Sequence, residues 1–131
     1  MLRFWRDGAW RSLAWGEFAL RVANAASGLR AMGVAPGDRV LLVSESRPEW
    51  NIADCALMAI GAVTVPTYTT NTPADHAHIL RDSGARAAIA STPALAARVM
   101  EGAVRAHGLD LLVVMDGAPA VVQPGTRLVA W

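Results

Sequence analysis

Ser44-Glu45-Ser46-Arg47-Pro48-Glu49-Trp50 lies at the centre of an alternating strand and helix pattern that runs from Gly33 to Gly84. The apolar run 39–43 that precedes it is suited to a buried strand. Ser46, followed by Glu49 three residues later, is typical of a capping box at the start of a helix. We therefore predict a strand over 39–43 and a helix that Ser46 caps and that Gly61 ends.

The second half of this stretch repeats the pattern. Residues 62–65 form another apolar run, which is predicted to be a strand ended by Pro66. Thr72 and Asp75 have the spacing of a second capping box, and Pro73 stands at the first helical position. A helix from Pro73 to about Ser83 follows.

The rest of the chain extends this unit in both directions. Apolar residues spaced by four and three predict a helix over 16–32, and a short strand is expected around Trp10–Leu13. Downstream we predict a strand over 87–90, a helix from Thr92-Pro93 to near His107, a strand over 111–114, a loop from Met115 to Pro124 and a strand over 128–131. Strand starts recur at roughly 24 residues. Such alternation predicts an α/β fold with an open, mostly parallel sheet.

Composition excludes several classes of function. The 131 residues carry 53% hydrophobic side chains, which argues against disorder, and a net charge of +1 without a basic run, which argues against nucleic-acid binding. All twelve basic residues are arginine, so a Walker-type phosphate loop and a Schiff-base lysine are both excluded. The single Cys55 excludes an internal disulfide and a cysteine metal cluster, and we expect it to be buried.

Membrane insertion is not expected either. The first residues lack the apolar core of a signal peptide. No charge occurs between Cys55 and Ala74, but the apolar part is shorter than the ~20 residues of a spanning helix. We expect a soluble cytoplasmic protein without a transmembrane segment, and leave peripheral membrane contact open.

Candidate binding residues lie where the predicted strands end, because parallel sheets bind ligands beyond these ends. Tyr68, Thr69 and Thr70 are the candidates for lining a substrate cleft, in a hydroxyl-rich stretch that runs from Thr67 to Asn71. Ordinary turn and cap chemistry already accounts for most of these residues and is the favoured interpretation. No catalytic, cofactor-binding or metal-binding residue is assigned.

The histidines do not point to a metal site. His76 and His78 lie two residues apart, so a helix directs them to different sides, and we expect surface exposure or partial packing for both. His107 is expected near a helix C-terminus, where it favours the helix dipole. Trp50 is interpreted as a core aromatic residue.

An ordered set of motifs resembles one family. The motifs are Trp15-Gly16-Glu17-Phe18-Ala19, Gly28-Leu29, the stretch 33–40, the stretch 44–50, Gly61-Ala62-Val63-Thr64-Val65-Pro66-Thr67-Tyr68 and the stretch 79–85. In order and spacing they resemble the N-terminal region of AMP-forming acyl-CoA synthetases over about residues 10–90. The Pro-Glu-Trp and Pro-x-Tyr-x-Thr forms look most like the long-chain fatty-acid branch. Ala14 departs from the family's frequent capping threonine.

The resemblance implies a two-step ligase. Fatty acid and ATP would give an acyl-adenylate and pyrophosphate, and CoA would then take the acyl group as a thioester, with Mg accompanying ATP. The family's phosphate-binding loop, its adenine motifs and its C-terminal domain have no counterpart here. Residues 1–131 are therefore expected to be an incomplete N-terminal α/β subdomain of the large domain of an adenylate-forming enzyme, inactive alone and prone to self-association through exposed apolar surface.

A rival interpretation stays open. The chain would then be a free-standing, non-enzymatic α/β module that binds a small ligand or a partner protein, since its strand and helix alternation is complete in itself. A dinucleotide-binding oxidoreductase domain is disfavoured because no Gly-x-Gly occurs.

Overall fold

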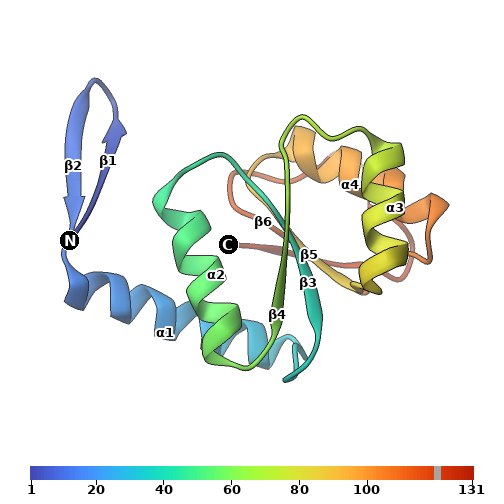
Figure 1. The fold of residues 1–131 in the computed structure, drawn as a ribbon, viewed down its shortest axis with the longest axis horizontal. Coiled ribbons are helices and arrows are strands. Elements are labelled where there is room, and N and C mark those ends of the chain that lie inside the picture. The colour runs from blue at the N-terminus through green and yellow to red at the C-terminus, as the bar shows by residue number, and fades with distance from the viewer. Residues whose placement is uncertain (120–121) are drawn as a thin grey trace.

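The structure, a computed structural model, describes residues 1–119 and 122–131 and has two parts (Figure 1). Its elements in chain order are β1 (Leu2–Arg6), β2 (Ala9–Leu13), α1 (Trp15–Ala31), β3 (Arg39–Val43), α2 (Pro48–Ala59), β4 (Val63–Thr67), α3 (Pro73–Ser83), β5 (Ala87–Ala90), α4 (Pro93–Arg105), β6 (Leu111–Val114) and β7 (Arg127–Ala130). β1 and β2 form an antiparallel hairpin. The other strands form a parallel sheet in the order β4-β3-β5-β6-β7, which confirms the predicted fold class.

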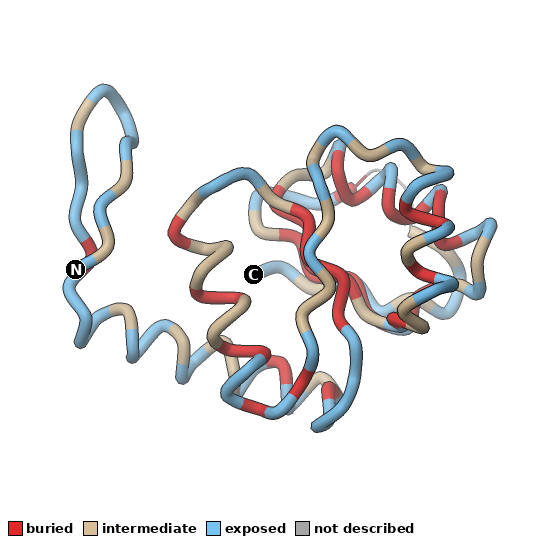
Figure 2. Tube along the Cα trace, viewed as in Figure 1, coloured by how far each residue is buried: buried red, intermediate tan, exposed pale blue. Residues whose placement is uncertain are grey.

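Helices cover both faces of the sheet because side chains alternate along each strand. Val40 and Leu42 of β3 pack with α1 and α2, whereas Leu41 and Val43 pack with α3 and α4. All four side chains are buried, and Figure 2 shows the buried residues gathered along the central strands. Burying a leucine or valine side chain contributes about 1.5–3 kcal/mol, so the two apolar layers fix the positions of the strand ends.

The capping prediction is confirmed at α3. The Thr72 side chain accepts a hydrogen bond from the Asp75 backbone amide, and the Asp75 carboxylate accepts one from the amide of Thr72. Gly84 ends this helix in the left-handed conformation, at φ +66°, where a side chain would be strained. A Cβ at Gly84 would also lie 2.8 Å from the Arg39 guanidinium, which donates to the carbonyl oxygens of Ser83 and Gly84. The first residue of β3 thus holds the end of α3.

The same prediction is wrong at α2. This helix begins at Pro48, its N-cap is Arg47, and no side chain caps it. Proline disfavours the helical conformation in the residue before it, and Arg47 is accordingly extended at φ −143° and ψ 159°. The helix therefore starts one residue later than a cap at Ser46 would require, and Glu49 is free for ion pairs.

Two strand predictions also need correction. Pro66 does not end β4 but lies within it, opposite Leu42. β4 is an edge strand, so one of its sides needs no hydrogen-bond donor and proline is tolerated.

The expected strand at 10–13 is the second half of a hairpin whose first strand was not predicted. Asp7 and Gly8 both have positive φ at its tip, as a two-residue hairpin turn requires.

Other predicted segments agree with the structure. The strands over 39–43, 87–90 and 111–114 have the predicted bounds, and the last predicted strand is β7. The predicted loop from Met115 to Pro124 includes residues 120 and 121, which lie outside the described residues. Among the helices that the structure describes, none combines the length and the apolar character needed to cross a membrane.

Candidate functional site

The carboxyl ends of β3 and β4 border a groove of about 480 Å³. It is lined by Ser44, Glu45, Ser46, Trp50, Pro66, Thr67, Tyr68 and Thr69. The lining therefore combines the loop after β3, the start of α2 and the loop after β4. This is the edge at which open parallel sheets bind ligands, and it is where the predicted cleft residues are found.

The three predicted cleft residues differ in their placement. Tyr68 and Thr69 line the groove, and the Tyr68 side chain is 79% exposed. Thr69 is half-buried, and its carbonyl oxygen accepts a hydrogen bond of 3.0 Å from Arg98 of α4. Thr70 is exposed and lies outside the lining. The structure brings Tyr68 and Thr69 to one groove and leaves their role in binding a prediction.

Ser91 ties the loop after β3 to the end of β5. Its hydroxyl is fully buried and donates a 2.6 Å hydrogen bond to the Glu45 carboxylate. Its backbone amide donates to the carbonyl oxygen of Val43. These two hydrogen bonds hold Glu45, which lines the groove, against the end of β5, and the Ser91 hydroxyl is engaged by the Glu45 carboxylate rather than free.

A cluster of ion pairs continues along the same edge. Arg47 donates from Nε to Glu49 at 2.8 Å and from its two terminal nitrogens to Asp116, in a bidentate pair. Arg6 of the hairpin donates to the other oxygen of Glu49 at 3.1 Å. Because β5 separates β3 from β6, Arg47 spans two strand spacings, about 10 Å, to reach Asp116. The cluster thus joins three segments that are distant in the sequence.

Arg47, Glu49 and Asp116 are held in their charged forms at neutral pH. The hydrogen bonds that Arg47 donates to Asp116 and Glu49 raise the pKa of Arg47. Burial raises the pKa of Glu49, but the hydrogen bonds from Arg47 and Arg6 outweigh it and lower that pKa to about 2. Arg47 also lowers the pKa of Asp116. A group locked in one charge state cannot exchange protons near neutrality, so the cluster braces the edge and does not act as an acid or base.

Sequence reasoning missed the Arg47–Asp116 pair, although a signal was present. Asp116 follows the predicted strand 111–114 by two residues, at the same edge as Arg47. Parallel strands bring such positions together, so opposite charges after two nearby strands predict a bridge. The strand order that makes them near neighbours was not readable from the sequence.

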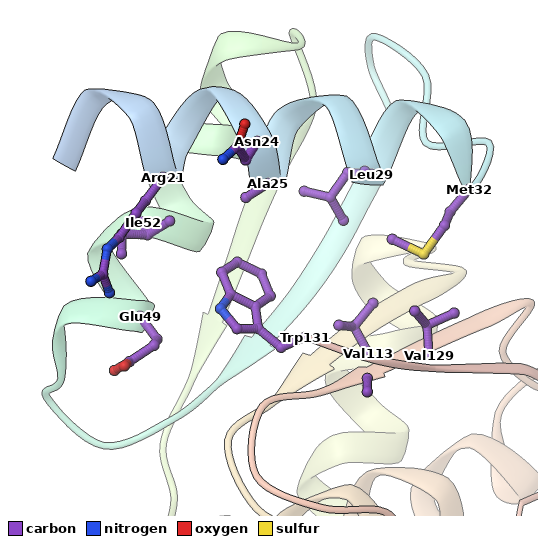
Figure 3. A pocket seen from close by; sticks show the side chains of 12 residues that line it. Arg21, Asn24, Ala25, Leu29, Met32, Glu49, Ile52, Val113, Val129 and Trp131 are labelled. Carbon is purple, nitrogen blue, oxygen red and sulfur yellow. The ribbon is translucent and has the colours of Figure 1, made fainter. Parts of the chain in front are cut away.

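A larger, apolar cavity of about 580 Å³ opens between α1 and the sheet edge formed by β6 and β7 (Figure 3). Ala25 and Leu29 of α1 line one wall, and Val113, Val129 and Trp131 line another. Figure 3 shows Arg21 and Glu49 together at one end of it. This cavity was not predicted, because its walls come from elements whose adjacency depends on the sheet order.

The histidines are placed differently from the prediction. His76 is fully buried, and within the described part of the chain neither ring nitrogen has a hydrogen-bond partner. Burial lowers the pKa of His76. Gly102 of α4 lets the two helices approach, since a Cβ there would lie 2.8 Å from the Cβ of His76. The expectation of surface or partial packing is thus wrong for His76, whereas His78 is exposed.

Candidate metal ligands do not gather in the part of the chain that the structure describes. Among residues 1–119 and 122–131, no three His, Cys, Asp or Glu side chains lie close enough to hold a metal ion. Cys55, expected to be buried, is half-buried on α2, and burial raises its pKa. No step through ATP, Mg or CoA is assigned to these residues.

Comparison with known proteins identifies the family. The model of the AMP-binding enzyme family matches residues 2–126. The long-chain-fatty-acid–CoA ligase FadD15 of Mycobacterium tuberculosis is 43% identical over 95 residues, which are 72% of this chain and 16% of that protein. The 4-coumarate–CoA ligase-like protein 5 of rice is 37% identical over 91 residues, 69% of this chain and 17% of that protein.

Solved structures agree with the sequence comparisons. A benzoate CoA ligase from Burkholderia xenovorans superposes with a TM-score of 0.71 and 30% identity, covering 92% of this chain and 26% of that chain. This chain spans about one sixth of the curated relatives that it matches. The observed resemblance to AMP-forming acyl-CoA synthetases is therefore confirmed.

Proposed function

Since this chain belongs to the AMP-binding enzyme family, we propose that it forms the first α/β part of a long-chain fatty-acid–CoA ligase. The whole enzyme would join a fatty acid to CoA in two steps. The carboxylate attacks the α-phosphorus of ATP and releases pyrophosphate, and the CoA sulfur then attacks the acyl carbonyl and releases AMP. ATP, Mg and CoA would serve this whole ligase, and we assign none of them to a residue of this chain.

The identity to FadD15 carries the proposal of a long-chain substrate. It is 43%, against 37% for the 4-coumarate–CoA ligase-like protein and 35% for the human acyl-coenzyme A synthetase ACSM5. Ligases for aromatic acids match as well, so the comparisons support an acid–CoA ligase in general, and the long-chain substrate is a further step that we propose. In this part of the fold, the sheet would position the strand-end loops, and Tyr68 and Thr69 would line a substrate cleft.

The proposal is tested first by the intact mass of the polypeptide in its source cells. A product several-fold heavier than 13.8 kDa is expected. The native species is then purified and supplied with ATP, Mg²⁺, CoA and either palmitate or 4-coumarate. Palmitoyl-CoA should form faster than coumaroyl-CoA, and the purified 131-residue protein should form neither thioester.

Each contrary result has a definite meaning. Faster reaction with 4-coumarate would overturn the long-chain specificity. Thioester formation by the 131-residue protein alone would overturn its assignment as one part of a larger ligase. A stable native species of 13.8 kDa would favour the rival, a non-enzymatic module, which the apolar packing on both sheet faces also supports.

A further inference from the structure

The hairpin of β1 and β2 presents one face away from the rest of the molecule. Its register places Arg3 opposite Ser12 and Trp5 opposite Trp10, so these four side chains share one face, which we name the outer face. Trp5 is 61% exposed and Trp10 is 62% exposed. Figures 1 and 2 show the hairpin standing beyond the N-terminal end of α1, apart from the parallel sheet and largely exposed.

The other face of the hairpin is directed toward the molecule. Leu2 and Phe4 are half-buried on it, and Leu13 is buried at the junction with α1. Near the tip, Arg6 donates to Glu49 at the start of α2. The hairpin is therefore attached at both ends, at Leu13 and at Arg6. This attachment sets the direction in which the outer face points.

The outer face is an ordered surface. The rings of Trp5 and Trp10 meet edge to face, with centroids 5.6 Å apart and planes at 78°. The Arg3 guanidinium lies 5.4 Å from the centroid of the Trp10 ring. Two large aromatic side chains and a cation are thus preassembled, so little side-chain freedom would be lost when this face binds a partner.

From this geometry we propose that the outer face docks on the surface of an anionic lipid bilayer. Tryptophan prefers the membrane interface, where its ring meets acyl chains and its N–H meets water and headgroups. Arginine near the surface is attracted by anionic lipids. On the outer face Arg3 supplies a positive charge and none of the other three residues is acidic, so the charge of this face complements such a surface.

A bilayer fits these observations better than a nucleic acid. Nucleic-acid binding needs a basic track that follows the phosphates, and the chain has a net charge of only +1. On the outer face Arg3 is the only cation. Membrane docking goes beyond the proposed ligase reaction and does not depend on it, because the interaction needs only the hairpin in its place.

The proposal is tested with the full chain by cosedimentation with vesicles. One set of vesicles contains phosphatidylcholine alone, and the other contains three parts phosphatidylcholine and one part phosphatidylglycerol. We expect binding to the anionic vesicles that weakens as salt is raised. Trp5→Ser with Trp10→Ser should lower the binding constant by at least about tenfold, and Arg3→Gln should lower it several-fold.

Matched controls separate this surface from general stickiness. Val104→Ser removes an apolar side chain that is 69% exposed on α4, and Arg127→Gln removes an exposed arginine of β7. Both variants should bind the anionic vesicles like the unmodified protein. Far-ultraviolet circular dichroism and a cooperative thermal transition check that each variant keeps its fold. If the double tryptophan variant unfolds, the effect of Arg3→Gln and the salt dependence of binding still test whether the outer face docks on the bilayer.

Three outcomes would overturn the proposal. Equal binding to both kinds of vesicle would remove the role of charge. Binding that Arg3→Gln and the tryptophan changes leave intact would place the contact elsewhere. Finally, the outer face could bind protein or nucleic acid instead. This would be established if the protein bound no vesicles but self-associated or bound an oligonucleotide, and if these same variants abolished that binding.

Discussion

Glu49 is the residue on which several parts of the molecule converge. Its carboxylate receives hydrogen bonds from Arg47 and from Arg6, and it lines the apolar cavity as well. Only 12% of its side chain is exposed, so water does little to replace these bonds. The ion pairs of this residue should therefore matter more than those on the open surface.

Acid should weaken the fold through Glu49. Its pKa falls from the ordinary 4.5 to about 2 on folding, so the folded state binds the proton less tightly than the unfolded chain. The resulting stabilisation is fully present above pH 4.5 and is lost as the pH falls toward 2. Glu49→Gln should lower the free energy of unfolding by about 1–3 kcal/mol at neutral pH, and by progressively less toward pH 2.

Urea unfolding at several pH values measures this difference. Glu101→Gln is the matched control, because Glu101 pairs with Arg105 on an exposed face of α4 and should contribute at most ~0.5 kcal/mol. If both substitutions lower the free energy of unfolding by the same amount, or if the effect of Glu49→Gln is independent of pH, the ion pairs of Glu49 do not stabilise the fold.

At the same scale, His76 shows what residue types alone leave undecided. Its position two residues from His78 correctly separates the two side chains, but it does not tell which one is buried. That choice depends on Gly102, whose missing side chain admits the His76 side chain between α3 and α4. How closely α3 and α4 pack depends on residues of both helices. The pattern within α3 alone therefore does not predict that His76 is buried.

Among the elements, α1 begins without a side-chain cap. Ala14 occupies the N-cap in an extended conformation, at φ −68° and ψ 152°, and Glu17 lies at the third helical position. A serine at 14 could accept the amide of Glu17, and Glu17 could return a bond to the cap. Ala14→Ser should raise the free energy of unfolding by about 1 kcal/mol.

Thermal unfolding followed by circular dichroism checks this prediction. Ala19→Ser is the control, since it introduces the same side chain at an exposed position inside α1. Serine has a lower helix propensity than alanine, so this control should lose roughly 0.5 kcal/mol. Equal effects of the two substitutions would show that the N-terminus of α1 does not gain from a cap.

Local signals predicted the elements well where one rule acted alone. Thr72, Pro73 and Asp75 agree on one helix start, and the structure has it. At α2 two rules conflict, because Ser46 favours an early start and Pro48 forbids it, and the backbone restriction wins. The hairpin was not predicted although Asp7-Gly8 is a strong turn signal. The reason is that the five-residue spacing of the tryptophans fits neither the period of a helix nor that of a strand.

For the whole molecule, the alternation of strands and helices predicted the parallel sheet but not its order. Residue spacing shows that β3, β5 and β6 are strands, whereas their adjacency follows from how crossovers pack on two faces. The groove near Tyr68 was predictable because it needs only the strand ends. The Arg47–Asp116 bridge and the apolar cavity need the order as well.

The apolar cavity should bind a hydrophobic dye in the otherwise folded protein. Gly28 of α1 lines it, and a Cβ at this position meets nothing within 4 Å. Gly28→Leu should fill part of the cavity and reduce the fluorescence of bound anilinonaphthalene sulfonate. It should also raise the free energy of unfolding by about 1 kcal/mol, because glycine inside a helix is unfavourable.

Ala23→Leu is the control, since it adds the same side chain at an exposed position of α1 that does not line the cavity. It should leave dye binding unchanged. A cooperative thermal transition in all three proteins ensures that the dye reports a cavity and not a loosened core. If Gly28→Leu and Ala23→Leu change the fluorescence alike, the dye binds elsewhere, and α1 does not border an open apolar site in solution.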